Sequence, residues 1–211
     1  MTRRRTLGVL ICVAVLASPT FAGAAGYKIV GWNNLGMHCM DAEFSVLSLL
    51  PPYNTIHAQV MDPSGNLVTD PTGAGIVVTY EAVADSTGSI NRTSEGKTNF
   101  WDFATALFGA SLPVDVGLTG ASMPGLANTP QPMTWDAASP WFATVGIPIM
   151  PYDDGRQKNP YPMMRLVART TGGSMLATTE IVCRFRTRRT AAFVMRPRPV
   201  LPLPRCLQEG G

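Results

Sequence analysis

The sequence contains few charged residues, few histidines and few strong helix formers. Lys, Arg, Asp and Glu together make up 15% of the chain, and it has only 2 histidines. Any histidine-based site can therefore use only His38 and His57. Gly (20 residues) and Pro (18 residues) are plentiful instead. This composition favours short strands joined by turns over a helical fold.

Long apolar runs are also missing, except near the start of the chain. Arg3, Arg4 and Arg5 precede an apolar run over residues 7–17, and Ala22-Gly23-Ala24 follows. A cationic start, an apolar centre and a small-residue site are the three parts of a secretory signal peptide. The apolar run is shorter than the about 20 residues that a membrane-spanning helix needs. We therefore expect residues 1–24 to be a signal peptide and the mature protein to be periplasmic or secreted, without a transmembrane segment. An uncleaved anchor is the alternative.

The charges are unevenly distributed along the chain. Residues 25–183 contain seven Lys and Arg against thirteen Asp and Glu, a net charge of −6. Residues 184–211 contain seven Arg, no Lys and one Glu, a net charge of +6. The body is therefore acidic, and the basic overall balance does not indicate a nucleic-acid partner.

Alternating and β-branched segments over residues 25–183 predict a mainly β domain. Residues 99–108 have apolar side chains at helical spacing, with Asn99 as a candidate N-cap and Gly109 as the stop. Residues 37–50 form either a short helix or an irregular loop. We therefore expect an immunoglobulin-like β-sandwich with one or two short inserted helices. The expected strands cover residues 27–32, 55–61, 75–83, 141–149, 163–169 and 174–183.

The character of the sequence changes after Cys183. Residues 184–211 are rich in Arg and Pro and show neither strand nor helix periodicity. We expect this tail to be either a disordered basic segment or the product of a shifted reading frame.

Several segments of the body resemble a family of exported, mostly uncharacterised bacterial proteins. Many of these are labelled cytochrome-like, and c-type haem motifs (CxxCH) often follow their N-terminal domain. The resemblance implies an exported domain of an electron-transfer protein with a redox protein partner. It also implies that Cys183 would open a CxxCH motif, but Arg184-Phe185-Arg186-Thr187 follows, so this chain lacks the attachment site. The matching segments are GWNNLGMHCMDAEFSVLSLLPPYNT (31–55), GKTNFWDFATALFG (96–109), LPVDVGLTG (112–120), GIPIMPYDD (146–154) and TTEIVC (178–183).

Met37, His38, Cys39 and Met40 form the densest group of candidate ligands. The family resemblance implies that His38 or Met37 is a candidate distal ligand to the haem of full-length relatives. Independently of haem, thioether, thiolate and imidazole ligands suit copper, and His57 could complete a metal site with His38 and Cys39. The alternative is that these side chains fill the core and bind no cofactor.

No residue of the chain is predicted to be catalytic. A Cys39–Cys183 disulfide is one way to pair two of the three cysteines that remain after cleavage. The Asp153-Asp154-Gly155 segment is expected to be a solvated turn. Beside electron transfer and copper binding, a cofactor-free structural or interaction domain is the third hypothesis.

Overall fold

The structure, a computed structural model, describes residues 26–45 and 49–188. The predicted signal peptide lies outside the described residues. In the described part of the chain, ten strands and one helix are present, and most strands pair antiparallel.

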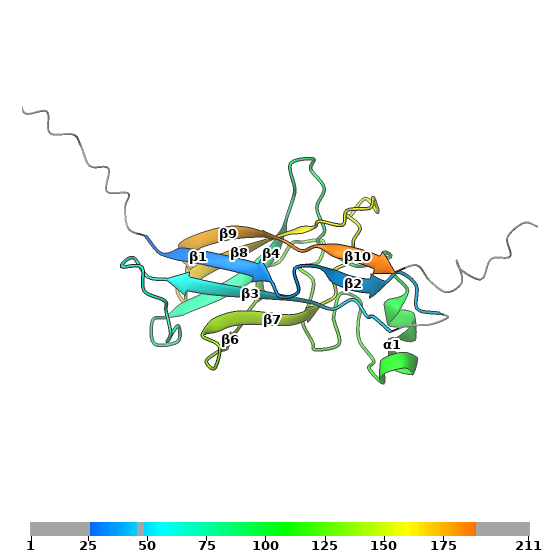
Figure 1. The fold of residues 1–211 in the computed structure, drawn as a ribbon, viewed down its shortest axis with the longest axis horizontal. Coiled ribbons are helices and arrows are strands. Elements are labelled where there is room, and N and C mark those ends of the chain that lie inside the picture. The colour runs from blue at the N-terminus through cyan, green and yellow to red at the C-terminus, as the bar shows by residue number, and fades with distance from the viewer. Residues whose placement is uncertain (1–25, 46–48, 189–211) are drawn as a thin grey trace, which may run out of the picture.

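Two four-stranded antiparallel sheets face each other (Figure 1). The first has the order β1-β3-β7-β6 and the second the order β5-β4-β8-β9. This alternation between sheets along the chain is that of an immunoglobulin-like sandwich, so the predicted fold class is confirmed. The first sheet consists of β1 (Lys28–Asn33), β3 (Asn54–Met61), β7 (Trp141–Ile147) and β6 (Thr134–Asp136). The second consists of β5 (Gln131–Pro132), β4 (Ile76–Val83), β8 (Met163–Thr170) and β9 (Met175–Val182).

The core lies between the sheets and follows the strand period of two. In β4, Ile76, Val78, Tyr80 and Ala82 are buried, whereas Val77 between them is exposed. Alternating side chains of a strand point to opposite faces, so one face of β4 lines the core.

A glycine sets the distance between the sheets at β1. A Cβ on Gly31 would lie 2.2 Å from Leu166 Cδ1 and 3.1 Å from Ile181 Cγ2. Leu166 is fully buried, so it has little room to move. The close approach of β1 to β8 and β9 therefore requires glycine at this position.

The single described helix, α1 (Phe100–Phe108), forms a second small core. Phe100 and Ala104 are fully buried against Phe44. The predicted stop at Gly109 is confirmed: its φ is 68°, and its N–H donates to Thr105 O at 3.0 Å. Asn99 occupies the predicted N-cap position, but its side chain binds Glu43 and the Phe44 N–H and makes no capping hydrogen bond to the helix.

The expected helix or loop at residues 37–50 contains a strand. Strand β2 (His38–Asp41) pairs in parallel with β10 (Phe185–Arg188). The sequence placed the end of the domain at Cys183, whereas the fold continues through Arg188, and Phe185 (3% exposed) joins the core. This strand was not predicted because Phe185 lies between two arginines, at the start of a segment that is rich in Arg and Pro. The rest of the tail lies outside the described residues.

Candidate functional site

The four candidate ligands at residues 37–40 do not converge on one point. In β2, His38 and Met40 are buried, whereas Cys39 is exposed. Met37 and Cys39 instead line a mostly apolar pocket of about 310 Å³, together with Leu50, Arg186 and Thr187. Because neighbouring residues of a strand face opposite sides, the group is divided into an inner and an outer pair.

His38 has structural partners inside the fold. Its Nε2 donates to Pro51 O at 3.3 Å, and its ring meets Phe185 edge-on at 5.8 Å. Burial lowers the pKa of His38, and the bond to Pro51 opposes this shift. These contacts explain the buried position of the His38 ring without a bound metal or haem.

His57 lies on another strand, between two tryptophan rings. Its centroid is 4.5 Å from that of Trp141 and 5.5 Å from that of Trp32, on the face of the first sheet that points away from the core. His57 is 6% exposed, and its Nδ1 has no hydrogen-bond partner. Burial lowers the pKa of His57, whereas the nearby Asp136 carboxylate raises it.

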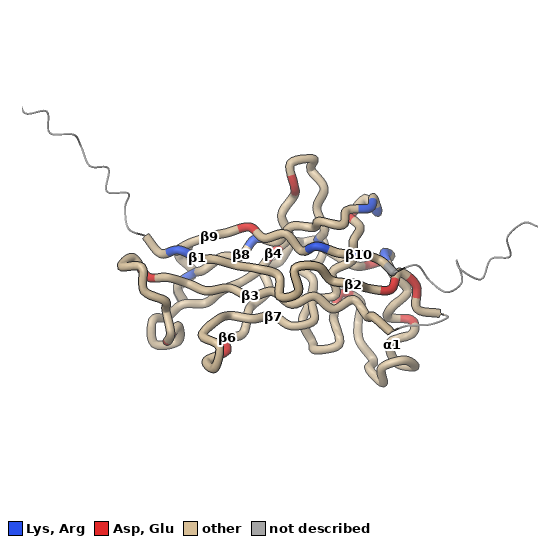
Figure 2. The backbone as a smooth tube through the Cα atoms, viewed as in Figure 1, with Lys and Arg blue, Asp and Glu red and all other residues tan. Residues whose placement is uncertain are grey.

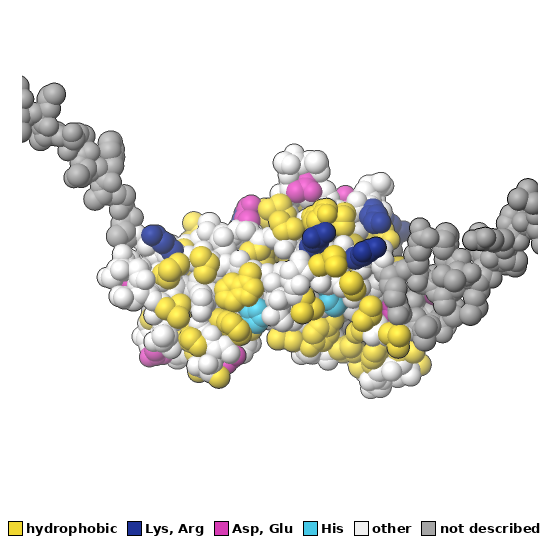
Figure 3. All heavy atoms as spheres, viewed as in Figure 1, with side chains coloured by type: hydrophobic (Ala, Val, Ile, Leu, Met, Phe, Trp, Pro, Cys, Tyr) yellow, Lys and Arg dark blue, Asp and Glu magenta, His cyan; other side chains and the backbone are white. Residues whose placement is uncertain are grey.

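The described residues do not assemble the predicted three-ligand metal site. Within residues 26–45 and 49–188, no group of three or more His, Cys, Asp or Glu side chains is placed to hold a metal ion. His57 belongs to β3 of the first sheet, and His38 and Cys39 belong to β2 of the separate β2–β10 pair. The two histidines also appear as separate patches on the face shown in Figure 3.

The two described cysteines are both free thiols, so the Cys39–Cys183 disulfide is not formed in this structure. Cys183 is fully buried, and this burial raises the pKa of its thiol to about 12, although a hydrogen bond with Asn33 opposes the shift. Its N–H donates to Pro162 O at 2.8 Å. A covalent haem does not fit here, because the thiol lies in the core and Phe185 and Arg186 continue as β10.

The rings of Trp32, His57 and Trp141 form an aromatic cluster on the outer face of the first sheet. The two tryptophans meet edge-on at 5.8 Å, and both are partly exposed. Val30 (44% exposed) and Val145 (42%) lie on the same face of β1 and β7. Figure 3 shows apolar side chains gathered over β1, β3 and β7. The sequence shows all these residues, but not that β1, β3 and β7 bring them together.

Charge is scarce on this sheet. Its four strands contain only two charged residues, Lys28 at one end and Asp136 at an edge, and the tube in Figure 2 is tan along most of β1, β3 and β7. The aromatic cluster therefore lies on a nearly uncharged, partly apolar surface.

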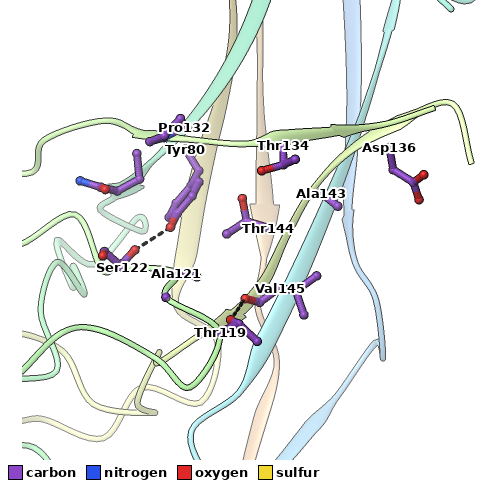
Figure 4. A pocket seen from close by; sticks show the side chains of 12 residues that line it. Tyr80, Thr119, Ala121, Ser122, Pro132, Thr134, Asp136, Ala143, Thr144 and Val145 are labelled. Carbon is purple, nitrogen blue, oxygen red and sulfur yellow. Dashed lines mark hydrogen bonds between the residues drawn. The ribbon is translucent and has the colours of Figure 1, made fainter. Parts of the chain in front are cut away.

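A larger pocket, of about 520 Å³, opens where the chain crosses between the sheets from β5 to β6 (Figure 4). Its lining mixes polar and apolar side chains and contains no histidine, cysteine, lysine or arginine. The Tyr80 hydroxyl donates to Ser122 O at 2.6 Å, and the buried Thr144 hydroxyl has no partner. Sequence analysis missed this pocket because its walls come from separate segments. The lining residues are Tyr80, Thr119, Gly120, Ala121, Ser122, Gln131, Pro132, Thr134, Asp136, Ala143, Thr144 and Val145.

A buried polar network joins segments that the sequence does not connect. The Lys97 side chain is 1% exposed and contacts Asp154 at 3.0 Å. Asp154 also accepts from Arg92 Nε at 2.7 Å, and Asp115 accepts from Thr93 and the Ser94 N–H. The expected solvated turn at Asp153-Asp154-Gly155 is therefore wrong for Asp154, whose side chain is 12% exposed. Three of the segments that carry the family resemblance meet in this network.

Comparisons with known proteins leave the family open. No protein-family model matches the chain, and no curated protein matches it. Among solved structures, MtrC from Shewanella baltica OS185 is similar, with a TM-score of 0.33 and 12% sequence identity. The similarity covers 78% of this chain, which spans 24% of the MtrC chain. A likeness this distant assigns neither a family nor a function.

In the described part of the chain, no helix combines the length and hydrophobicity needed to span a bilayer.

Proposed function

We propose that this chain is an exported interaction domain of a c-type cytochrome-like electron-transfer system. It docks onto a haem-bearing redox protein and carries no covalent haem itself. The family resemblance supports the redox context. The missing CxxCH motif and the buried Cys183 support a role without haem attachment in this chain.

The observation that carries the proposal is the aromatic cluster of Trp32, His57 and Trp141 on a nearly uncharged sheet face. Interface centres are depleted in charge and enriched in aromatic side chains, and Trp is prominent among the residues that dominate binding energy. Two partly exposed tryptophans held in place by a histidine ring are pre-ordered, so little side-chain entropy is lost on docking. The acidic body elsewhere adds long-range attraction to a cationic partner surface.

Binding of purified c-type cytochromes from the same compartment, measured by calorimetric titration, tests this function. We expect one of them to bind, and Trp32→Ala and Trp141→Ala each to raise its Kd at least about tenfold, equivalent to about 1.4 kcal/mol. Val30→Glu places a charge on the same face without removing a ring, and we expect it to raise the Kd as well.

Tyr161→Ala is the matched control, because Tyr161 is an exposed aromatic residue (51%) outside the first sheet. Circular dichroism checks that each variant is folded. Binding by none of the cytochromes, or equal affinity of wild type and both Trp variants, contradicts the proposal.

A second candidate function is binding of copper(I) by Met37 and Cys39. The specific observation is that these two sulfur-containing side chains line the same small pocket, whereas His38 and Met40 face inward. Thioether and thiolate are the soft ligands that copper(I) prefers. The copper ligands expected from the sequence are therefore reduced to the two that face outward, Met37 and Cys39.

Copper(I) affinity, measured by competition with a chromophoric chelator, tests this candidate. We expect Cys39→Ser and Met37→Leu each to weaken binding at least about tenfold, since each removes one of two ligands. Met40→Leu is the matched control, because it changes the same residue type on the opposite face and should leave the affinity unchanged. Equal effects of Met37→Leu and Met40→Leu overturn the assignment.

A further inference from the structure

Lys97 is a buried amine with two fixed neighbours. Its side chain is 1% exposed. Its Nζ donates to Asn91 Oδ1 at 2.9 Å and to Asp154 Oδ1 at 3.0 Å. Nothing in the proposed docking or copper sites uses this group. The amine is therefore held against a carboxamide and a carboxylate at the same time.

Asn91 presents its carboxamide in a fixed orientation. The residue is 1% exposed, and its Nδ2 donates to Met150 O at 2.5 Å. The carbonyl oxygen is thereby directed at Lys97, and the carbonyl carbon lies at most one bond length farther from Nζ than this oxygen does. Such pre-positioning replaces a bimolecular encounter and removes most of its entropic cost.

Asp154 completes the arrangement. Its side chain is 12% exposed, and it accepts from Lys97 Nζ and from Arg92 Nε and the Arg92 N–H. Burial lowers the pKa of Lys97, which favours the neutral, nucleophilic amine, whereas the bond to Asp154 opposes the shift. The same burial excludes the water that would hydrolyse the amide.

We propose that Lys97 and Asn91 form an intramolecular amide crosslink, with Asp154 transferring protons. The Lys97 nitrogen gives a proton to the Asp154 carboxylate and attacks Cγ of Asn91. The bond from Cγ to Nδ2 breaks while the bond from Cγ to Nζ forms. Both protons that Nζ loses end on the leaving nitrogen, which departs as an ammonium ion, and Asp154 returns to the carboxylate. No group is oxidised or reduced, and no co-reactant is needed.

The crosslink fixes the segment between β4 and α1. It ties Asn91, where this segment enters the buried network, to Lys97, which lies shortly before the helix begins at Phe100. It also removes the positive charge of a buried ammonium, whose burial carries a large desolvation cost. Arg92 remains as the cationic partner of Asp154.

Mass spectrometry of the purified wild-type protein tests the crosslink. We expect the protein, and the chymotryptic peptide that spans Asn91 and Lys97, to be lighter than calculated from the sequence by the mass of one ammonia. We also expect trypsin not to cleave after Lys97. Lys97→Arg, Asn91→Ala and Asp154→Asn should each show the mass calculated for their sequence.

Lys158→Arg is the control, because it replaces an exposed lysine and should keep the mass deficit. A wild-type peptide with its full calculated mass and normal cleavage after Lys97 overturns the proposal, whether or not any variant folds. A deficit that persists in Lys97→Arg also overturns it, because the lost ammonia then comes from another reaction.

Discussion

Asp154→Ala is expected to lower the free energy of unfolding by about 3–5 kcal/mol, the range for removing one partner of a buried ion pair. The variant leaves Lys97 (side chain 1% exposed) without its counter-ion and removes the acceptor for Arg92 Nε. It also lacks the proposed proton acceptor, so Lys97 keeps a free amine whether or not the wild type is crosslinked. Urea unfolding followed by circular dichroism measures the loss.

Two further variants isolate the cause of this destabilisation. Adding Lys97→Met to Asp154→Ala removes the buried amine that has lost its partner, and we expect it to recover part of the lost stability in a double-mutant cycle. Glu95→Ala removes an exposed carboxylate near the network and should change stability by no more than about 0.5 kcal/mol. An Asp154→Ala protein as stable as Glu95→Ala would show that the network contributes little.

Phe185→Ala is expected to lower the free energy of unfolding by about 3–5 kcal/mol, as for other buried phenylalanines. Phe185 is 3% exposed, packs edge-on against His38 at 5.8 Å, and its N–H donates to Pro160 O at 2.9 Å. The variant leaves a cavity beside His38 in the corner where β2 and β10 pair. Thermal and urea unfolding report the change.

Arg186→Ala is the matched control for this prediction, because Arg186 is the exposed neighbour of Phe185 in the same strand. We expect it to alter stability by less than about 1 kcal/mol. Equal, small effects of the two substitutions would mean that residues after Cys183 do not belong to the fold. That outcome would return the domain boundary to the position expected from the sequence.

Local patterns were sufficient where the signal lies within the strand itself or within the turn that follows it. The expected strand at residues 75–83 is β4 (Ile76–Val83), and the expected hairpin at residues 163–183 is β8 and β9. Both follow from β-branched residues and a Gly-Gly turn, which act within a few residues of one another. The helix also followed from its own apolar spacing, and its Gly109 stop was recognisable in the same way.

The strand at residues 38–41 was missed because its partner lies far away in the chain. His38 pairs with Phe185, and nothing near His38 indicates that pairing. The partner of Lys97 was missed for the same reason, because one helix and three strands lie between Lys97 and Asp154 in the chain. Asp154 therefore reads as part of a solvated turn in the sequence and becomes a buried anion only in the folded protein.

The candidate ligands show the same division. The sequence by itself determined that Met37, His38, Cys39 and Met40 are adjacent, that Lys97 follows Asn91 closely, and that alternating segments form a β-sandwich. Only the tertiary structure decided which ligands face the same way, that Trp32, His57 and Trp141 share one face, and that a carboxylate meets the buried amine of Lys97. Alternation and turn chemistry act between neighbouring residues, whereas a site requires side chains whose distance depends on how the sheets pair and pack.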